Sequence, residues 1–178
     1  MKKISLPLLL VLLNISLYAK ANNPISAEVF YNHQKLEHKF SAFDDTSLNL
    51  GVVGVSLGYQ FTDNIALVYK IGTGVFDDEM YAFKFKTQLY TSLQLASKYH
   101  LSDALYLYGA AGAGLNKVNQ KSGGNINIKG LTTEFGAGYQ LNRVTDIKVT
   151  WEKIFNNTTY DGADVELSSL NISLSYNF

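Results

Sequence analysis

The chain has 178 residues, and its 15 basic residues balance its 15 acidic ones. This balance gives no reason to expect nucleic acid, whose binding surfaces are strongly positive, so no nucleic-acid partner is expected. Charged residues form 17% of the sequence, below the roughly 25% of soluble domains, whereas tyrosine, phenylalanine and glycine are frequent. Cysteine is absent, so neither a disulfide framework nor a lipoprotein anchor is expected.

The beginning of the chain is typical of a secretory signal. Two lysines precede an apolar run over residues 4–17, and small residues follow at Ala19 and Ala21. A retained membrane anchor is the weaker interpretation, because the run is shorter than the ~20 residues of a spanning helix and contains a proline. We predict a signal peptide over residues 1–21 and one mature domain over residues 22–178.

Beyond the signal, apolar and polar residues alternate with period two, which is typical of strands with one apolar face. The clearest case is the end of the chain, where one face carries Leu170, Ile172, Leu174, Tyr176 and Phe178 and the other carries Asn171, Ser173, Ser175 and Asn177. The same pattern predicts eight strands, at about 26–34, 48–61, 65–75, 84–101, 104–117, 129–142, 146–156 and 167–178.

The connections between these strands alternate in length. The short turns are 62–64, 102–103 and 143–145, and the longer polar loops are 35–47, 76–83, 118–128 and 157–166. An even number of strands with short periplasmic turns and longer outer loops is the layout of outer-membrane barrels. The predicted fold class is all-β, an eight-stranded antiparallel up-and-down transmembrane β-barrel with both termini in the periplasm.

A weak internal repeat places aromatic residues next to the short turns. Segments 58–61, 98–101, 138–141 and 175–178 align at spacings of about 40, 40 and 37 residues. They predict a periplasmic aromatic girdle made of Tyr59, Phe61, Tyr99, Tyr139 and Tyr176. The alternative is that tyrosine stands at these positions only because it is a good strand former.

The polar strand faces separate a membrane barrel from a soluble lipocalin-like barrel, whose solvated faces would be rich in lysine and glutamate. Here they carry mainly glycine, serine, glutamine and asparagine, which favours a packed interior. Alternate residues of a strand point to the same face. Their positions relative to the outward apolar residues then place six charges inside: Glu28, Lys70, Lys98, Glu134, Lys148 and Glu152. We predict that these charges fill the lumen with an ion-pair and hydrogen-bond network, helped by Tyr90, Tyr106 and Tyr108. A narrow ion channel is the alternative interpretation.

Three segments resemble a known family. Residues 106–114 and 135–141 read as alternating glycine and aromatic or apolar strands, and the chain ends in Leu-Ser-Tyr-Asn-Phe. The chain resembles the small outer-membrane barrels that include the transmembrane domain of OmpA and the OmpX/Ail/Lom group. The resemblance implies that Tyr176 and Phe178 act as the signal that the barrel-assembly machinery recognises during biogenesis.

A lipid A-modifying enzyme is a more distant alternative. His33, His38 and His100 are the histidines available as a general base, and spacing alone does not join them to a serine and an acid. Lipid A deacylases that share the barrel carry a His–Ser pair on the seventh strand, whereas residues 151–155 read Trp-Glu-Lys-Ile-Phe. We therefore predict no catalytic residues, no cofactor and no metal site, since the acidic loops lack fixed calcium-ligand spacing.

The expected function is that of a non-enzymatic integral protein of the cell outer membrane. As the resemblance implies, it would display four surface loops with a role in envelope integrity, adhesion or host interaction. Its expected partners are outer-membrane lipid, lipopolysaccharide, and a host or surface ligand at loops 35–47, 76–83, 118–128 and 157–166.

Overall fold

Long antiparallel strands make up the protein in a computed structural model that describes residues 24–39, 46–62, 64–80, 83–121, 124–155, 159–160 and 163–178. The strands are β1(Ile25–Lys39), β2(Thr46–Thr62), β3(Ile65–Met80), β4(Phe83–His100), β5(Leu105–Gln120), β6(Asn125–Gln140), β7(Thr145–Phe155), β8(Thr159–Tyr160) and β9(Ala163–Asn177). In this part of the chain, no helix combines the length and the apolar character that membrane crossing requires. The predicted signal peptide lies outside the described residues.

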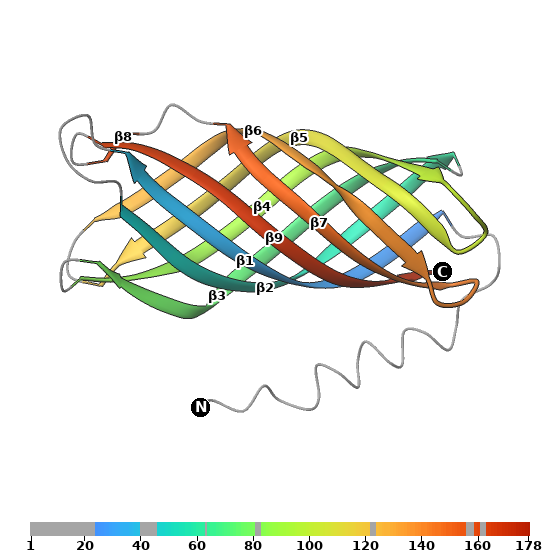
Figure 1. The fold of residues 1–178 in the computed structure, drawn as a ribbon, viewed down its shortest axis with the longest axis horizontal. Helices are drawn as coiled ribbons and strands as arrows, with labels where there is room; N and C mark the ends of the chain where they lie inside the picture. The colour runs from blue at the N-terminus through green and yellow to red at the C-terminus, as the bar shows by residue number, and fades with distance from the viewer. Residues whose placement is uncertain are drawn as a thin grey trace.

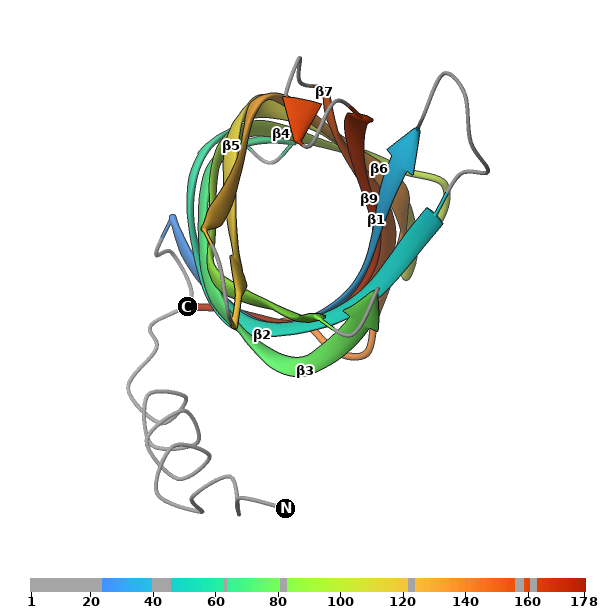
Figure 2. The same ribbon diagram turned by 90° about the vertical axis from the view of Figure 1, so that its left-hand side faces the viewer.

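The strands close into a ring (Figures 1 and 2). Each of β1 to β7 pairs antiparallel with its neighbour along the chain, β7 pairs with β9, and β9 returns to β1. The closing ladder runs from Ser26 opposite Asn177 to Lys39 opposite Asp164. The two-residue β8 pairs with the first residues of β9 and is not a further strand of the ring. The prediction of a closed, eight-stranded antiparallel barrel is confirmed.

Three tight turns lie at the end of the barrel that holds the C-terminus, which we call the turn end (Figure 1). Side-chain oxygens close these turns. The Thr62 hydroxyl accepts from the backbone N–H of Ile65 at 3.1 Å, and the Ser102 hydroxyl accepts from that of Leu105 at 3.1 Å. The Asn142 amide oxygen accepts from two backbone N–H groups at 3.0 Å. These bonds explain why short threonine, serine and asparagine residues hold the turns.

At the opposite end, which we call the loop end, the structure contradicts one prediction. Paired strands continue to His38 opposite Thr46 and to Met80 opposite Phe83, and β5 and β6 stay paired as far as Asn119 opposite Asn125. The four long loops predicted at 35–47, 76–83, 118–128 and 157–166 are therefore wrong for much of their length. Polar residues on the outward face suggested loops, but the backbone ladder continues beneath them.

The barrel is polar inside and apolar outside over most of its height. Among the described buried side chains, polar and charged residues outnumber apolar ones, whereas large apolar side chains on the outer wall are 36–70% exposed. A soluble protein does not leave so large a continuous apolar surface in water. This inside-out distribution excludes the lipocalin-like alternative.

Glycines on the inner wall make room for large interior side chains. A Cβ atom at Gly138 would overlap the ring of Tyr106, and one at Gly54 would overlap the ring of Phe30. A Cβ atom at Gly109, on the outer wall, would meet no atom within 4 Å. The interior therefore fills by pairing a glycine on one strand with an aromatic ring on another.

We predict that Gly138→Ala destabilises the barrel by about 1–3 kcal/mol, because the new methyl group must displace a buried ring. The measurement is urea unfolding in phospholipid vesicles, followed by the gel mobility of folded and unfolded protein. The matched control is Gly109→Ala, for which a change within about 0.5 kcal/mol is expected. Adding Tyr106→Leu should recover part of the loss, and equal effects of the two glycine substitutions would contradict the packing account.

Candidate functional site

Two ion pairs lie inside the barrel. Lys70 Nζ lies 2.6 Å from Glu134 Oε2, with both side chains fully buried, and Lys148 Nζ lies 2.9 Å from Glu28 Oε2. Glu134 also accepts hydrogen bonds from Thr150 and Asn171. Such charges are tolerated away from bulk water only when paired and hydrogen-bonded, as these are. Four of the six charges predicted inside the barrel therefore form these two ion pairs.

The other two predicted charges have different partners. Lys98 Nζ lies 3.0 Å from Asp146 Oδ2 at the turn end, where the lysine side chain is 25% exposed. The sequence analysis overlooked Asp146, although it shares inward parity with Lys148 and Glu152 on β7. That shared parity is the signal by which it could have been found.

Glu152 is buried, and no cation of the described residues lies within ion-pair distance of its carboxylate. Its carboxylate accepts from the Tyr90 hydroxyl at 2.7 Å, the Thr132 hydroxyl at 2.8 Å and the Gln94 amide at 3.1 Å. The six charges predicted inside the barrel do not all pair with one another, because Lys98 pairs with Asp146. Neutral donors replace the cation at Glu152, and Tyr90 thereby joins the network as predicted.

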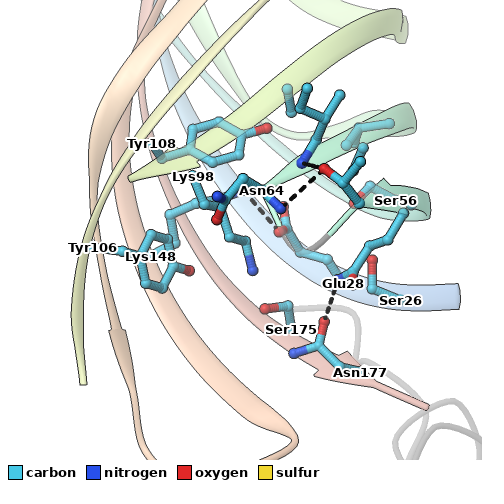
Figure 3. Close-up of a pocket in the computed structure, with 17 residues that line it drawn as sticks. Ser26, Glu28, Ser56, Asn64, Lys98, Tyr106, Tyr108, Lys148, Ser175 and Asn177 are labelled. Atoms are coloured by element: carbon cyan, nitrogen blue, oxygen red, sulfur yellow. Dashed lines mark hydrogen bonds and ion pairs between the residues drawn. The ribbon is translucent and has the colours of Figure 1, made fainter. Parts of the chain in front are cut away.

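A cavity of about 40 Å³ opens at the turn end between the network and the tight turn from β2 to β3. Tyr106, Tyr108 and Lys148 lie on one side of it, and Glu28 lies on the other side (Figure 3). The ammonium group of Lys148 also lies 4.0 Å from the centre of the Tyr108 ring. A space of this size holds water, and the charged residues of its lining are Glu28, Lys98 and Lys148.

The loop end holds an apolar cluster that the sequence analysis missed. Its side chains point inward and are at most 2% exposed: Leu36, Leu48, Leu50, Phe85, Val118, Ile126, Ile128, Ile154, Val165 and Leu167. They come from seven of the eight barrel strands. This plug closes the lumen above the polar network.

A switch in the parity of apolar residues produces the plug. On β6, Ile126 and Ile128 point inward beside an outward Lys129, whereas farther along the strand Leu131 points outward and Glu134 inward. The same reversal occurs on β9 between the buried Leu167 and the exposed Leu170. Most barrel strands have 15–18 residues, more than the ~9–11 that cross a membrane. The reversal therefore indicates where the wall leaves the bilayer.

The predicted aromatic girdle residues point outward at the turn end. Tyr59, Phe61, Tyr99 and Tyr139 are each at least half exposed. The Tyr176 ring packs at 5.1 Å between centroids against Phe178, whose backbone N–H donates to the Ile25 carbonyl at 3.0 Å. The last residue is thus tied to the first strand.

The three histidines do not converge on a serine and an acid in the described part of the chain. His33 points outward and His38 inward from the same strand, while His100 lies at the turn end. Ser41 or Ser47 could be activated by His33 or His38 with Asp44 or Asp45 as the acid. Ser47 is exposed, and Ser41, Asp44 and Asp45 lie outside the described residues. Among the described residues, no cluster of three metal-binding side chains forms.

An inside-out barrel whose interior is filled by its own side chains is the architecture of a small outer-membrane protein. The protein-family model of the outer membrane protein beta-barrel domain matches residues 7–178 of the sequence. The chain belongs to this family. No curated protein shows a significant sequence match to it.

Solved structures show the same fold. Neisserial surface protein A has a TM-score of 0.66 at 15% identity, covering 88% of this chain and 98% of its own. Ail, the attachment invasion locus protein of Yersinia pestis, solved with the heparin analogue sucrose octasulfate, has a TM-score of 0.61 at 16% identity, covering 86% and 97%. The N-terminal barrel of Pseudomonas aeruginosa OprF has a TM-score of 0.50 at 16% identity, covering 84% and 97%. At these identities the likeness concerns the fold.

We predict that Lys70→Met destabilises the barrel by about 3–5 kcal/mol, because it leaves the Glu134 carboxylate buried without its cation. The double variant Lys70→Met/Glu134→Gln should be more stable than the single one, since a neutral amide oxygen can still accept from Asn171. Lys35→Met is the control, because Lys35 pairs with Glu37 at the exposed surface and such pairs contribute about 0–1 kcal/mol. Urea unfolding in vesicles measures all three, and a double variant as unstable as the single would contradict the charge explanation.

Proposed function

We propose that this protein is a non-enzymatic surface protein of the outer membrane, closed to diffusion, that acts in envelope integrity, adhesion or host interaction. The apolar plug carries the proposal. It closes the lumen and lets the paired strands continue as a rigid wall, whose outward face is polar beyond the bilayer. Function then falls to the outer surface of the loop end.

The orientation belongs to the same proposal. Short turns lie on the periplasmic side of outer-membrane barrels, so the turn end and both chain ends would face the periplasm. The loop end would then face outward and project roughly 10 Å beyond the bilayer, from about five excess residues on each tilted strand. The eight strand ends there would be the first part of the protein that a foreign surface meets.

The structural likeness to Ail supports the adhesion role. That protein is named for attachment and invasion and was solved with a heparin analogue. The shared feature on which we rely is the fold of a small closed barrel.

A narrow channel is the second candidate, and polar atoms without a partner in the lumen favour it. Side-chain atoms of Asn32, Gln34 and Ser173 are buried without a protein partner, and such atoms are normally satisfied by water. This hydrated stretch ends beneath the apolar plug, which an ion would have to cross without its water. Stepwise conductance of the purified protein in planar bilayers would favour the channel over the closed surface protein.

The adhesion role predicts that bacteria producing the protein attach to host cells more strongly than bacteria with an empty vector. Replacing residues 79–84 by Asn-Gly trims the β3–β4 hairpin at a register that a two-residue turn can close, with Asp78 still opposite Phe85. Attachment should fall for this variant if the loop end makes the contact with the host cell. The control is Gly109→Ala, and folded surface protein must be equal in all strains. No gain over the empty vector would exclude adhesion.

The terminal aromatics are proposed as the assembly signal. We predict that deleting Phe178, or Tyr176→Asp, lowers the amount of folded protein in the outer membrane severalfold, measured by gel mobility without boiling. Tyr139→Asp is the matched control, because Tyr139 has a similar outward position near a tight turn but lies far from the chain end. If Tyr139→Asp is equally harmful, the loss reflects a general aromatic girdle and not a terminal signal.

A further inference from the structure

Lysines are unevenly distributed around the outer wall at the loop end. On β4 to β7 the outward lysines of this region are Lys84, Lys86, Lys117, Lys129 and Lys153. The acidic residues of these four strands, Glu134, Asp146 and Glu152, all point inward. Outward acids of the loop end lie instead on the remaining strands, for example Asp77 and Glu79 on β3 and Glu166 on β9. One half of the wall is therefore basic.

The lysines at the borders of this half are already engaged by acids. Lys84 Nζ lies 2.8 Å from Glu79, and the hydrogen bond to that carboxylate raises the pKa of Lys84. Lys153 Nζ lies 3.1 Å from Glu166. Lys86 forms no ion pair with a described acid, but it stands opposite Asp77 in the β3–β4 ladder, so an acid is its cross-strand neighbour.

The two central lysines differ from these. No described carboxylate lies within ion-pair distance of Lys117 or Lys129. In the β5–β6 register Lys117 stands opposite Asn127, and Lys129 opposite Leu115. The two lysines are thus diagonal neighbours, with Cβ atoms roughly 7–8 Å apart, and their long side chains can reach one anionic group together.

These lysines stand at the upper edge of the apolar band. Leu131, the outward residue next to Lys129, is 57% exposed, and Leu115 is the outward neighbour of Lys117. In a bilayer this edge is the level of the lipid headgroups. An anion that meets both lysines here is held at that level.

Beneath the lysines, the outer wall of β5 is shallow. Gly109, Ala111 and Ala113 point outward there, with Leu93 and Leu95 of β4 on one side and Leu131 and Phe135 of β6 on the other. Small residues between larger ones leave a trough that runs down from the lysine pair. Apart from Ser97 and Thr133 its lining is apolar, which suits a hydrocarbon chain.

We propose that Lys117 and Lys129, with the trough over Gly109, Ala111 and Ala113, form a docking site for a phosphate-bearing lipid of the leaflet at the loop end. The phosphate contacts the two ammonium groups, and an acyl chain lies along β5. The continuity of charge with an apolar trough favours a lipid over a soluble polyanion, which would use the lysines alone.

The single tryptophan of the chain reports on this site. Trp151 lies on the outer wall of β7, and its ring packs against Phe135 at 5.2 Å between centroids, one side of the trough. The folded protein is placed in phosphatidylcholine vesicles that contain phosphatidic acid or phosphatidylcholine with a nitroxide label on the acyl chain. In wild-type protein, labelled phosphatidic acid should quench Trp151 with severalfold preference over labelled phosphatidylcholine, and salt should weaken the preference.

The double variant Lys117→Gln/Lys129→Gln should lose this preference, with each lysine accounting for up to about fivefold. Lys35→Gln is the matched control, because Lys35 is an outward lysine of the loop end that pairs with Glu37 in the acidic half. Gel mobility before and after boiling verifies that all three proteins are folded.

Two results would overturn the proposal. One is equal quenching of the wild-type protein by the two labelled lipids, and the other is a preference that the double variant retains. If sucrose octasulfate binds the wild-type protein through these lysines while no lipid preference exists, the basic half is a surface for soluble polyanions instead.

Discussion

The ladder between β1 and β9 is the interaction on which the remaining structure depends. In hydrocarbon, each unpaired backbone N–H or C=O group costs several kcal/mol, so a strand sheet is stable there only as a closed ring. The register of this ladder also fixes which face of every strand points inward. A slip by one residue would turn Glu28 and Asn32 toward lipid and Val29 toward the polar lumen. Closure and the placement of the charges are therefore one requirement.

Closure creates an interior too narrow for bulk water, and the polar network follows from that. Lys70 and Glu134 are stable there because each compensates the other, and Glu152 because three neutral groups donate to it. Near the loop end the outside changes from lipid to water. The same physical rule then places apolar residues inside and polar residues outside, as in an ordinary soluble barrel. The parity switch from Ile128 to Leu131 marks this boundary within one strand.

Alternation in the sequence was sufficient to predict the eight strands, the tight turns and the inward position of six charges. It failed where the parity reverses, because the rule that polar residues indicate loops was applied to segments such as 35–39, whose ladder continues under a polar surface. Parity also cannot tell which charges meet across the lumen. Lys148 and Glu28 are 120 residues apart in the chain, and only the curvature of the closed barrel brings them together.

The plug and the network resist ion passage for different physical reasons, and this bears on where function resides. An ion entering from the turn end meets compensated charges that bind one another, and an ion at the loop end meets side chains that offer no polar contact. Opening one barrier leaves the other in place. The outer wall, with its basic half and its acidic half, is left as the surface through which the protein meets its surroundings.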